Sequence, residues 1–165
     1  MAHTYRKELL IDWLRDAYAI EKALTQVLDN QAKRAEIFPH VSSRLQGHLE
    51  VTRRHADMVK SCIERNGANI SRLKSGVASV FGELQSQSLT SSPANVVRDA
   101  IMGAAAEQME ISTYLAIITL AQDIGDDETV RICKEILTEE EEMHAWLEGE
   151  LPTLVREAVQ KGELK

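Results

Sequence analysis

Apolar residues recur every three or four positions along four long stretches of the chain. These stretches cover residues 5–35, 39–65, 92–123 and 127–148. This spacing is that of an α-helix with one buried face. Pro39 and Pro93 suit the first turn of a helix, where a missing N–H costs nothing. Gly67 and Gly125 suit the residue that follows a helix. The pattern therefore predicts an all-α fold built from long helices.

The connection over residues 68–92 is too long for a simple turn. An amphipathic segment within it, over 73–84, predicts a short helix, and a Ser/Thr-rich segment follows. Two long helical hairpins joined by such a crossover form the ferritin-like class of four-helix bundle. We expect a single domain over residues 1–165, with a further short C-terminal helix that begins at Pro152.

Net charge and hydropathy limit the kinds of partner that we expect this protein to bind. The net charge is −7 and no basic patch is present, so we expect no nucleic-acid partner. No apolar run approaches the roughly 18 residues of a membrane span, and the N-terminus lacks the apolar segment of a signal peptide. We therefore expect a cytoplasmic protein without a membrane partner. Cys62 and Cys133 lie far apart on apolar stripes, where we expect buried, reduced thiols.

Polar residues interrupt the apolar stripes at positions where leucine is expected. Glu21 lies in the stripe of the first helix, and His48 and His55 lie in that of the second. The third carries Glu107 within a stripe that also includes Ile101 and Leu115. In the fourth, the run Glu139–Glu142 precedes His144, which lies on the apolar face itself. Carboxylates and imidazoles that face a core require partners or a metal.

The heights of these residues in each hairpin predict which of them meet. Glu21 and His55 are equally far along the chain from the turn at Phe38, one before it and the other after it. Glu107 and His144 lie at nearly equal distances on either side of the turn at Gly125, and Glu110 and Glu140 lie at equal distances from it. His48 is much nearer to Phe38 than Glu21 is, so we expect a core role for it rather than a ligand role. Each hairpin thus places a carboxylate opposite a histidine near mid-bundle.

The cluster predicts a metal site inside the bundle. Hard carboxylates with a few imidazoles suit iron or manganese, as one or two ions, and open positions on them would bind oxygen or peroxide. Glu140 and Glu141 compete for one inward position, because His144 is four residues from the first and three from the second. We expect solvated side chains at Glu139 and Glu142 and place Glu140 in the site. The predicted metal ligands are Glu21, His55, Glu107, Glu110, Glu140 and His144.

Several segments together resemble the YciE/YciF-type ferritin-like proteins. They are Asp-Ala-Tyr-Ala-Ile-Glu-Lys-Ala-Leu over 16–24, His-Leu-Glu-Val-Thr-Arg-Arg-His over 48–55, Glu-Gln-Met-Glu-Ile-Ser-Thr-Tyr over 107–114, and Glu139-Glu140 with His144. The resemblance extends from about residue 7 to 151. It implies a bundle related to ferritin and rubrerythrin, a homodimer, and an association with bacterial stress responses.

Two positions depart from the family pattern that the resemblance implies. Val51 stands where the second helix would carry a glutamate that bridges two metals, and Gln108 stands where histidine is frequent. Glu50 points away from the stripe and does not replace the missing glutamate. The resemblance therefore leaves two hypotheses. One is a metal protein that reacts with a small-molecule oxidant; the other is a non-catalytic dimeric helical protein that has lost the dinuclear site.

Overall fold

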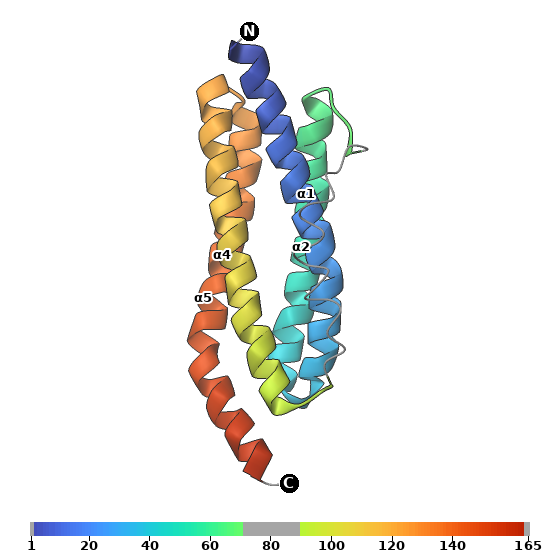
Figure 1. Ribbon diagram of the computed structural model, residues 1–165, viewed down its shortest axis with the longest axis vertical. Coiled ribbons are helices and arrows are strands. Elements are labelled where there is room, and N and C mark those ends of the chain that lie inside the picture. Colours follow the sequence, from blue (N-terminus) through green and yellow to red (C-terminus); the bar gives the residue numbers. More distant parts are fainter. Residues whose placement is uncertain (1, 71–89, 164–165) are drawn as a thin grey trace.

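The computed structural model describes residues 2–70 and 90–163, and the described part contains four long helices (Figure 1). Helix α1 descends from the N-terminus and α2 returns alongside it, whereas α4 ascends and α5 descends as the second hairpin. Helices α2 and α4 therefore run parallel, as a crossover connection requires. The short 3₁₀ helix η1 joins α1 to α2. The bounds are α1 Ala2–Arg34, η1 Ala35–Ile37, α2 Pro39–Arg65, α4 Pro93–Ile124 and α5 Asp127–Glu163.

Local signals fix the helix ends close to the predicted positions. Pro39 begins α2, and Gly67 follows it with a φ of 78°, in the left-handed region that glycine tolerates. The side chain of Ser92 accepts a hydrogen bond from the backbone of Asn95 and caps α4. Gly125, with a φ of 75°, ends α4. The predicted all-α class and the ferritin-like bundle are therefore confirmed.

The C-terminal region differs from its prediction. Pro152 does not begin a separate short helix but lies inside α5, which continues to Glu163. Leu154, which is 1% exposed, packs into the apolar cluster at that end of the bundle and holds the segment in place. The amphipathic helix predicted over 73–84 lies outside the described residues.

Two apolar clusters fill the ends of the bundle and leave a polar layer between them. The cluster beside the α4–α5 turn contains Leu14, Val59, Ile117 and Ile136. The cluster beside the α1–α2 turn contains Phe38, and its other members include Val41, Leu45, Val96, Met143 and Leu147. The buried carboxylates and imidazoles lie between the two clusters along the helices. Among the described residues, no helix is long and apolar enough to cross a membrane.

Candidate metal centre

Four carboxylates and two imidazoles are buried in the polar layer of the bundle. All four helices contribute, and no member of the set is more than 6% exposed. The set consists of Glu21 on α1, His48 and His55 on α2, Glu107 and Glu110 on α4, and Glu140 on α5. Burial of so many ionisable groups is costly unless charges or protons are shared.

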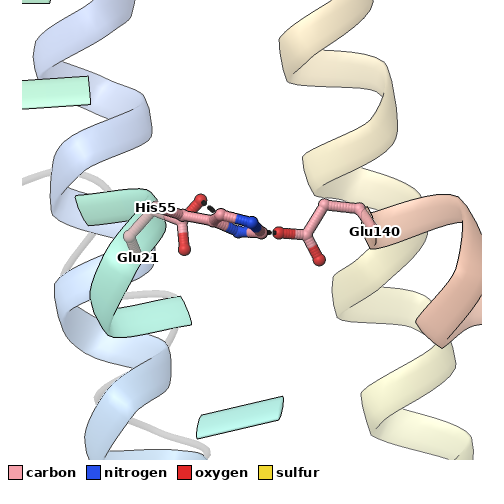
Figure 2. A group of neighbouring side chains, drawn as sticks. All are labelled: Glu21, His55 and Glu140. Carbon is pink, nitrogen blue, oxygen red and sulfur yellow. Dashed lines mark ion pairs between the residues drawn. The ribbon is translucent and has the colours of Figure 1, made fainter. Parts of the chain in front are cut away.

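One half of this set joins α1, α2 and α5 (Figure 2). Nδ1 of His55 lies 2.6 Å from Oε1 of Glu140 and 3.8 Å from Oε1 of Glu21. All three side chains are fully buried. One ligand atom from each lies within 4.8 Å of the others, so the three donors can hold a single ion. We call this group the His55 group.

The other half, which we call the His48 group, joins α2, α4 and α5. Nε2 of His48 lies 3.2 Å from Oε1 of Glu107 and 3.6 Å from Oε2 of Glu140. Their donor atoms also lie within 4.8 Å of one another. Glu140 is therefore shared: its Oε1 faces the His55 group and its Oε2 faces the His48 group. A carboxylate placed in this way can bridge two cations.

Several buried polar atoms of the set have no hydrogen-bond partner within the described part of the chain. They include Oε2 of Glu21, Oε2 of Glu107, Oε1 of Glu110 and both carboxylate oxygens of Glu140. Nδ1 of His55 is close to Glu140 but does not meet it with hydrogen-bond geometry. Native proteins leave few buried polar atoms unpaired, so a group of them at one place is a candidate site for an ion.

Residues around the set orient its members. Glu139 contacts Nε2 of His55 and also accepts hydrogen bonds from the Arg54 guanidinium. Glu139, predicted to be solvated, is partly exposed at 29%, and its carboxylate makes these contacts at the edge of the set. The hydroxyl of Tyr114, buried in the core, donates a hydrogen bond to Oε1 of Glu21. A carboxylate behind a ligating imidazole fixes the ring and raises its basicity.

Burial and mutual repulsion keep protons on three of the carboxylates. Burial, reinforced by the charge of Glu140, raises the pKa of Glu21 to about 8. Burial and the neighbouring carboxylates likewise raise the pKa values of Glu107 and Glu110 well above the ordinary glutamate value. The ion-free set is therefore protonated at several positions near neutral pH.

The two histidines and Glu140 behave differently. Burial lowers the pKa of His48 to about 4, so its imidazole is neutral and free to act as a ligand. For His55, burial opposes the charged form, but Glu140 and Glu21 outweigh it and raise the pKa. Burial also opposes ionisation of Glu140, but contacts with His55 and Glu107 lower its pKa. Glu140 is thus the carboxylate that remains charged.

Five of the six predicted ligands come together, and His144 lies apart from them. Nδ1 of His144 is 3.1 Å from the backbone oxygen of Ala104, and Nε2 is 3.6 Å from Oε1 of Glu148. The expected pairing of Glu107 with His144 does not form between these two described residues. Glu107 faces His48 instead. Of the competing glutamates, Glu140 is buried and Glu141 is exposed.

The sequence predicts a core role for His48, and the side chain is buried, but its contacts with two carboxylates were not predicted because its height was compared only with that of the first helix. The carboxylates that meet it, Glu107 and Glu140, belong to the other hairpin. One signal was present: His48 and His55 are seven residues apart, two helical turns on one face. Val51 is half-buried and Glu50 is exposed beside Arg53, so α2 supplies imidazoles to the set and no carboxylate.

The fold and this layer of buried carboxylates and imidazoles together define a ferritin-like four-helix bundle. A family model described as a domain of unknown function, DUF892, matches residues 5–160. The chain is also 31% identical over 138 residues to the protein YciF of Escherichia coli, with 81% of this chain and 82% of YciF covered. The chain belongs to the DUF892 family.

Solved structures show the same fold. A protein of Xanthomonas campestris superposes with a TM-score of 0.82 at 28% identity, over 96% of this chain and 99% of that one. The E. coli stress protein YciF superposes with a TM-score of 0.75 at 24% identity, over 92% and 97%. A Desulfovibrio desulfuricans bacterioferritin, described with its diiron site, gives 0.76 at 19% identity over 93% and 84%.

Proposed function

We propose that this protein binds iron or manganese in the polar layer of its bundle, as one ion or as a pair. The observation that carries the proposal is the group of buried carboxylate oxygens, with one imidazole nitrogen of His55, that lack hydrogen-bond partners among the described residues. Bound cations would neutralise the carboxylates and take up these free positions. The bacterioferritin fold, which carries a diiron site in that protein, supports the same proposal.

The donor set fits such ions. Carboxylate oxygens with a minority of imidazoles, and no thiolate within reach, suit iron and manganese better than softer metals. Glu21 and His55 would hold one ion, His48 and Glu107 the other, and Glu140 would join both. Glu110, fully buried with a free oxygen, is available beside them. Bound there, iron or manganese would supply redox chemistry toward oxygen or peroxide, in keeping with a role in stress responses like that of YciF.

The protein's own residues would manage protons and orientation. Glu21, Glu107 and Glu110 hold protons without an ion and must release them when one binds, so binding should strengthen as pH rises. Tyr114 steadies Glu21 through its hydroxyl, and Glu139 holds the His55 ring from the opposite side. The surrounding apolar clusters exclude bulk water from both ends of the layer.

Metal analysis of untagged protein tests the proposal. After aerobic and anaerobic loading with iron(II) or manganese(II) and removal of loose ions, the wild-type chain should retain at least one ion. Glu140→Ala should lose most of it, because both groups share Glu140. Glu141→Ala, an exposed change at the neighbouring position, should retain the wild-type amount. Circular dichroism of each variant would verify the helices. Only trace metal in the wild type under both conditions would overturn the proposal.

One observation favours a second candidate, a non-catalytic helical protein. Val51 leaves α2 without a carboxylate in the layer, while Glu–His contacts already pair some of the charges. Thermal melting of wild type and Glu21→Ala with and without metal discriminates the two. A metal site requires that iron or manganese raise the wild-type melting temperature more than that of the variant. If neither melting temperature moves, the non-catalytic function holds.

We also propose a cytoplasmic homodimer that contacts its copy through α4. Ile101 and Leu115 are each 50% exposed, although both were predicted to face the core, and Met102 is 42% exposed. All three acidic residues of α4 between Arg98 and Asp123 are buried. The outer face of α4 therefore carries no charge over this length, which is typical of the core of an interface.

A further inference from the structure

The two cysteines meet inside the bundle, away from the metal-binding layer. Cys62 on α2 and Cys133 on α5 are both fully buried in the apolar cluster beside the α4–α5 turn. Cys62 follows His55 by seven residues and Cys133 precedes Glu140 by seven, which places both about 10 Å from the layer along the helices. The sequence predicts buried, reduced thiols at both positions, and both cysteines are free and buried.

The two cysteines lie at the same level of α2 and α5. His55 and Glu140 approach to 2.6 Å, and Cys62 and Cys133 lie two helical turns from each of them in the same direction along the bundle. The neighbouring Cys133 thiol, together with the Thr129 hydroxyl and the charge of Arg65, outweighs burial and lowers the pKa of Cys62 to about 7. The proximity of Cys62, then burial, raises the pKa of Cys133. Near neutral pH a large fraction of Cys62 is therefore thiolate, whereas Cys133 remains a thiol. A thiolate is the form that attacks an oxidant.

A group of polar residues lies between this pair and the surface. A hollow of about 280 Å³ is lined in part by Arg65, Asn66 and Asp126. From there Arg65 Nη2 reaches Thr129 Oγ1 at 2.7 Å and Asp126 Oδ1 at 2.9 Å. Thr129, itself fully buried, contacts Cys62. Arg65 and Thr129 thus separate Cys62 from the hollow, and a small polar oxidant could enter by a local opening of this group.

We propose that Cys62 and Cys133 form a redox-active dithiol that a hydroperoxide oxidises to a disulfide between α2 and α5. The Cys62 thiolate attacks one peroxide oxygen; the O–O bond breaks, and Cys62 becomes a sulfenic acid as hydroxide leaves. The Cys133 sulfur then attacks the Cys62 sulfur, the S–O bond breaks, and the thiol proton leaves with the departing hydroxide as water. The hydroxide released in the first step takes up the equivalent of the proton that Cys62 lost on ionisation. In total, two thiols and hydrogen peroxide yield one disulfide and two waters. This chemistry needs no metal.

Disulfide formation requires the two sulfurs to approach. A disulfide has an S–S distance of about 2.05 Å and usually a Cα separation below about 7 Å. Both cysteines are free, so oxidation must bring their sulfurs from a non-bonded separation to this distance. The bridge would tie the two hairpins to each other covalently, since α2 belongs to one and α5 to the other. Its formation should therefore raise the melting temperature of the full chain.

The test uses the full-length, chelator-treated protein, so that its outcome is independent of the metal site. Protein is treated with stoichiometric hydrogen peroxide, then denatured, and its thiols are titrated. The titre should fall from two per chain to none, the intact mass should fall by two hydrogens, and peptide mapping should join Cys62 to Cys133. Dithiothreitol should restore both thiols.

Single substitutions distinguish Cys62, which attacks the peroxide, from Cys133, which completes the disulfide. Cys133→Ser should stop at a Cys62 sulfenic acid, detectable with dimedone, whereas Cys62→Ser should leave Cys133 as a thiol. Circular dichroism verifies that each variant folds. If a variant misfolds, the peptide mapping of the oxidised wild-type protein tests the proposal. Two unreacted thiols, a bridge between different chains, or overoxidation of a single cysteine in the wild-type protein would each overturn the proposal.

Discussion

Glu140 is the residue through which the two halves of the buried layer are linked. Its two oxygens face different imidazoles, and it keeps its charge while the carboxylates around it hold protons. This division follows from proximity, because several buried carboxylates cannot all ionise together without a compensating cation. The histidines divide similarly, with His48 neutral and His55 inclined to protonation. The ion-free protein thus holds a set of protons that binding of cations would displace.

The stability of the metal-free protein should fall as pH rises from about 6.5 to 8. The folded-state pKa of Glu21 is raised from 4.5 to about 8, so its stabilising contribution is complete below 4.5 and is lost as pH approaches 8. Glu107, Glu110 and His55, whose pKa values are also raised, act in the same direction. Cys62, whose pKa is lowered from 9.0 to about 7, opposes them above pH 7, but it is one group against several. Each proton contributes a slope of up to about 1.4 kcal/mol per pH unit. Denaturant unfolding with a chelator present measures this slope.

His48 affects stability in the opposite direction, but its effect lies below the window of pH 6.5 to 8. Its pKa is lowered to about 4, so its contribution is complete above 6.5 and is lost only as pH falls from there toward 4. Glu21→Gln should make the slope between 6.5 and 8 less steep, because one titrating group is removed. An exposed change such as Glu141→Gln should leave the slope unchanged. Stability that stays level or increases with pH over this window would contradict the protonated layer.

Individual residues of the layer were predictable to different degrees. The Glu21–His55 approach follows from one short turn, because residues equally distant from it lie at the same height. His48, expected in the core, meets Glu107 and Glu140, whereas His144, expected beside Glu107, lies apart, since contacts between hairpins depend on how the hairpins are rotated and offset. Glu139 was missed for the same reason, because its contacts with Arg54 and His55 cross from α5 to α2.

Helix α5 continues through Pro152, although proline normally interrupts a helix. Proline removes one backbone hydrogen bond and disfavours the helix interior, which is why a break was predicted at Pro152. The helix nevertheless continues to Glu163, beyond the turn between α1 and α2 (Figure 1). Leu154 is buried against the bundle, and Leu151 packs partly against the same cluster. Tertiary packing on both sides of the proline maintains a helix that propensity alone would interrupt.

Replacing Pro152 with alanine should therefore stabilise the C-terminal part of α5. The change restores a donor and a better helix former at an exposed position, and we expect a gain on the order of 1–3 kcal/mol in local stability. Hydrogen exchange of the amides in residues 148–162 should slow. Thr153→Ala, at the adjacent exposed position, is the matched control and should have a much smaller effect. Faster exchange in Pro152→Ala would show that the proline is required for the path of α5.

At the scale of the whole molecule, α4 differs from the other helices in having an uncharged outer face. Apolar residues occur on more than one side of α4, so the sequence pattern could not distinguish the side that packs in the bundle from the side left exposed. Ile101 and Leu115 were assigned to the core for this reason. A groove of about 420 Å³ between α1 and α4 adjoins this face and is lined by Trp13, Ile20 and Met109 among others. Periodicity thus predicted the bundle but not its outward surface.

A charge placed on this face should separate the proposed homodimer into monomers. Leu115→Glu puts a carboxylate where an isologous contact would bury it, and in a twofold dimer the change occurs twice, so the cost is doubled. Light scattering after size exclusion should give two chains for the wild type and one for Leu115→Glu. Val159→Glu, which changes an exposed apolar residue on α5, is the matched control and should remain dimeric. A monomeric wild-type protein would contradict the proposed homodimer. A dimeric Leu115→Glu variant would show that the interface lies on another face.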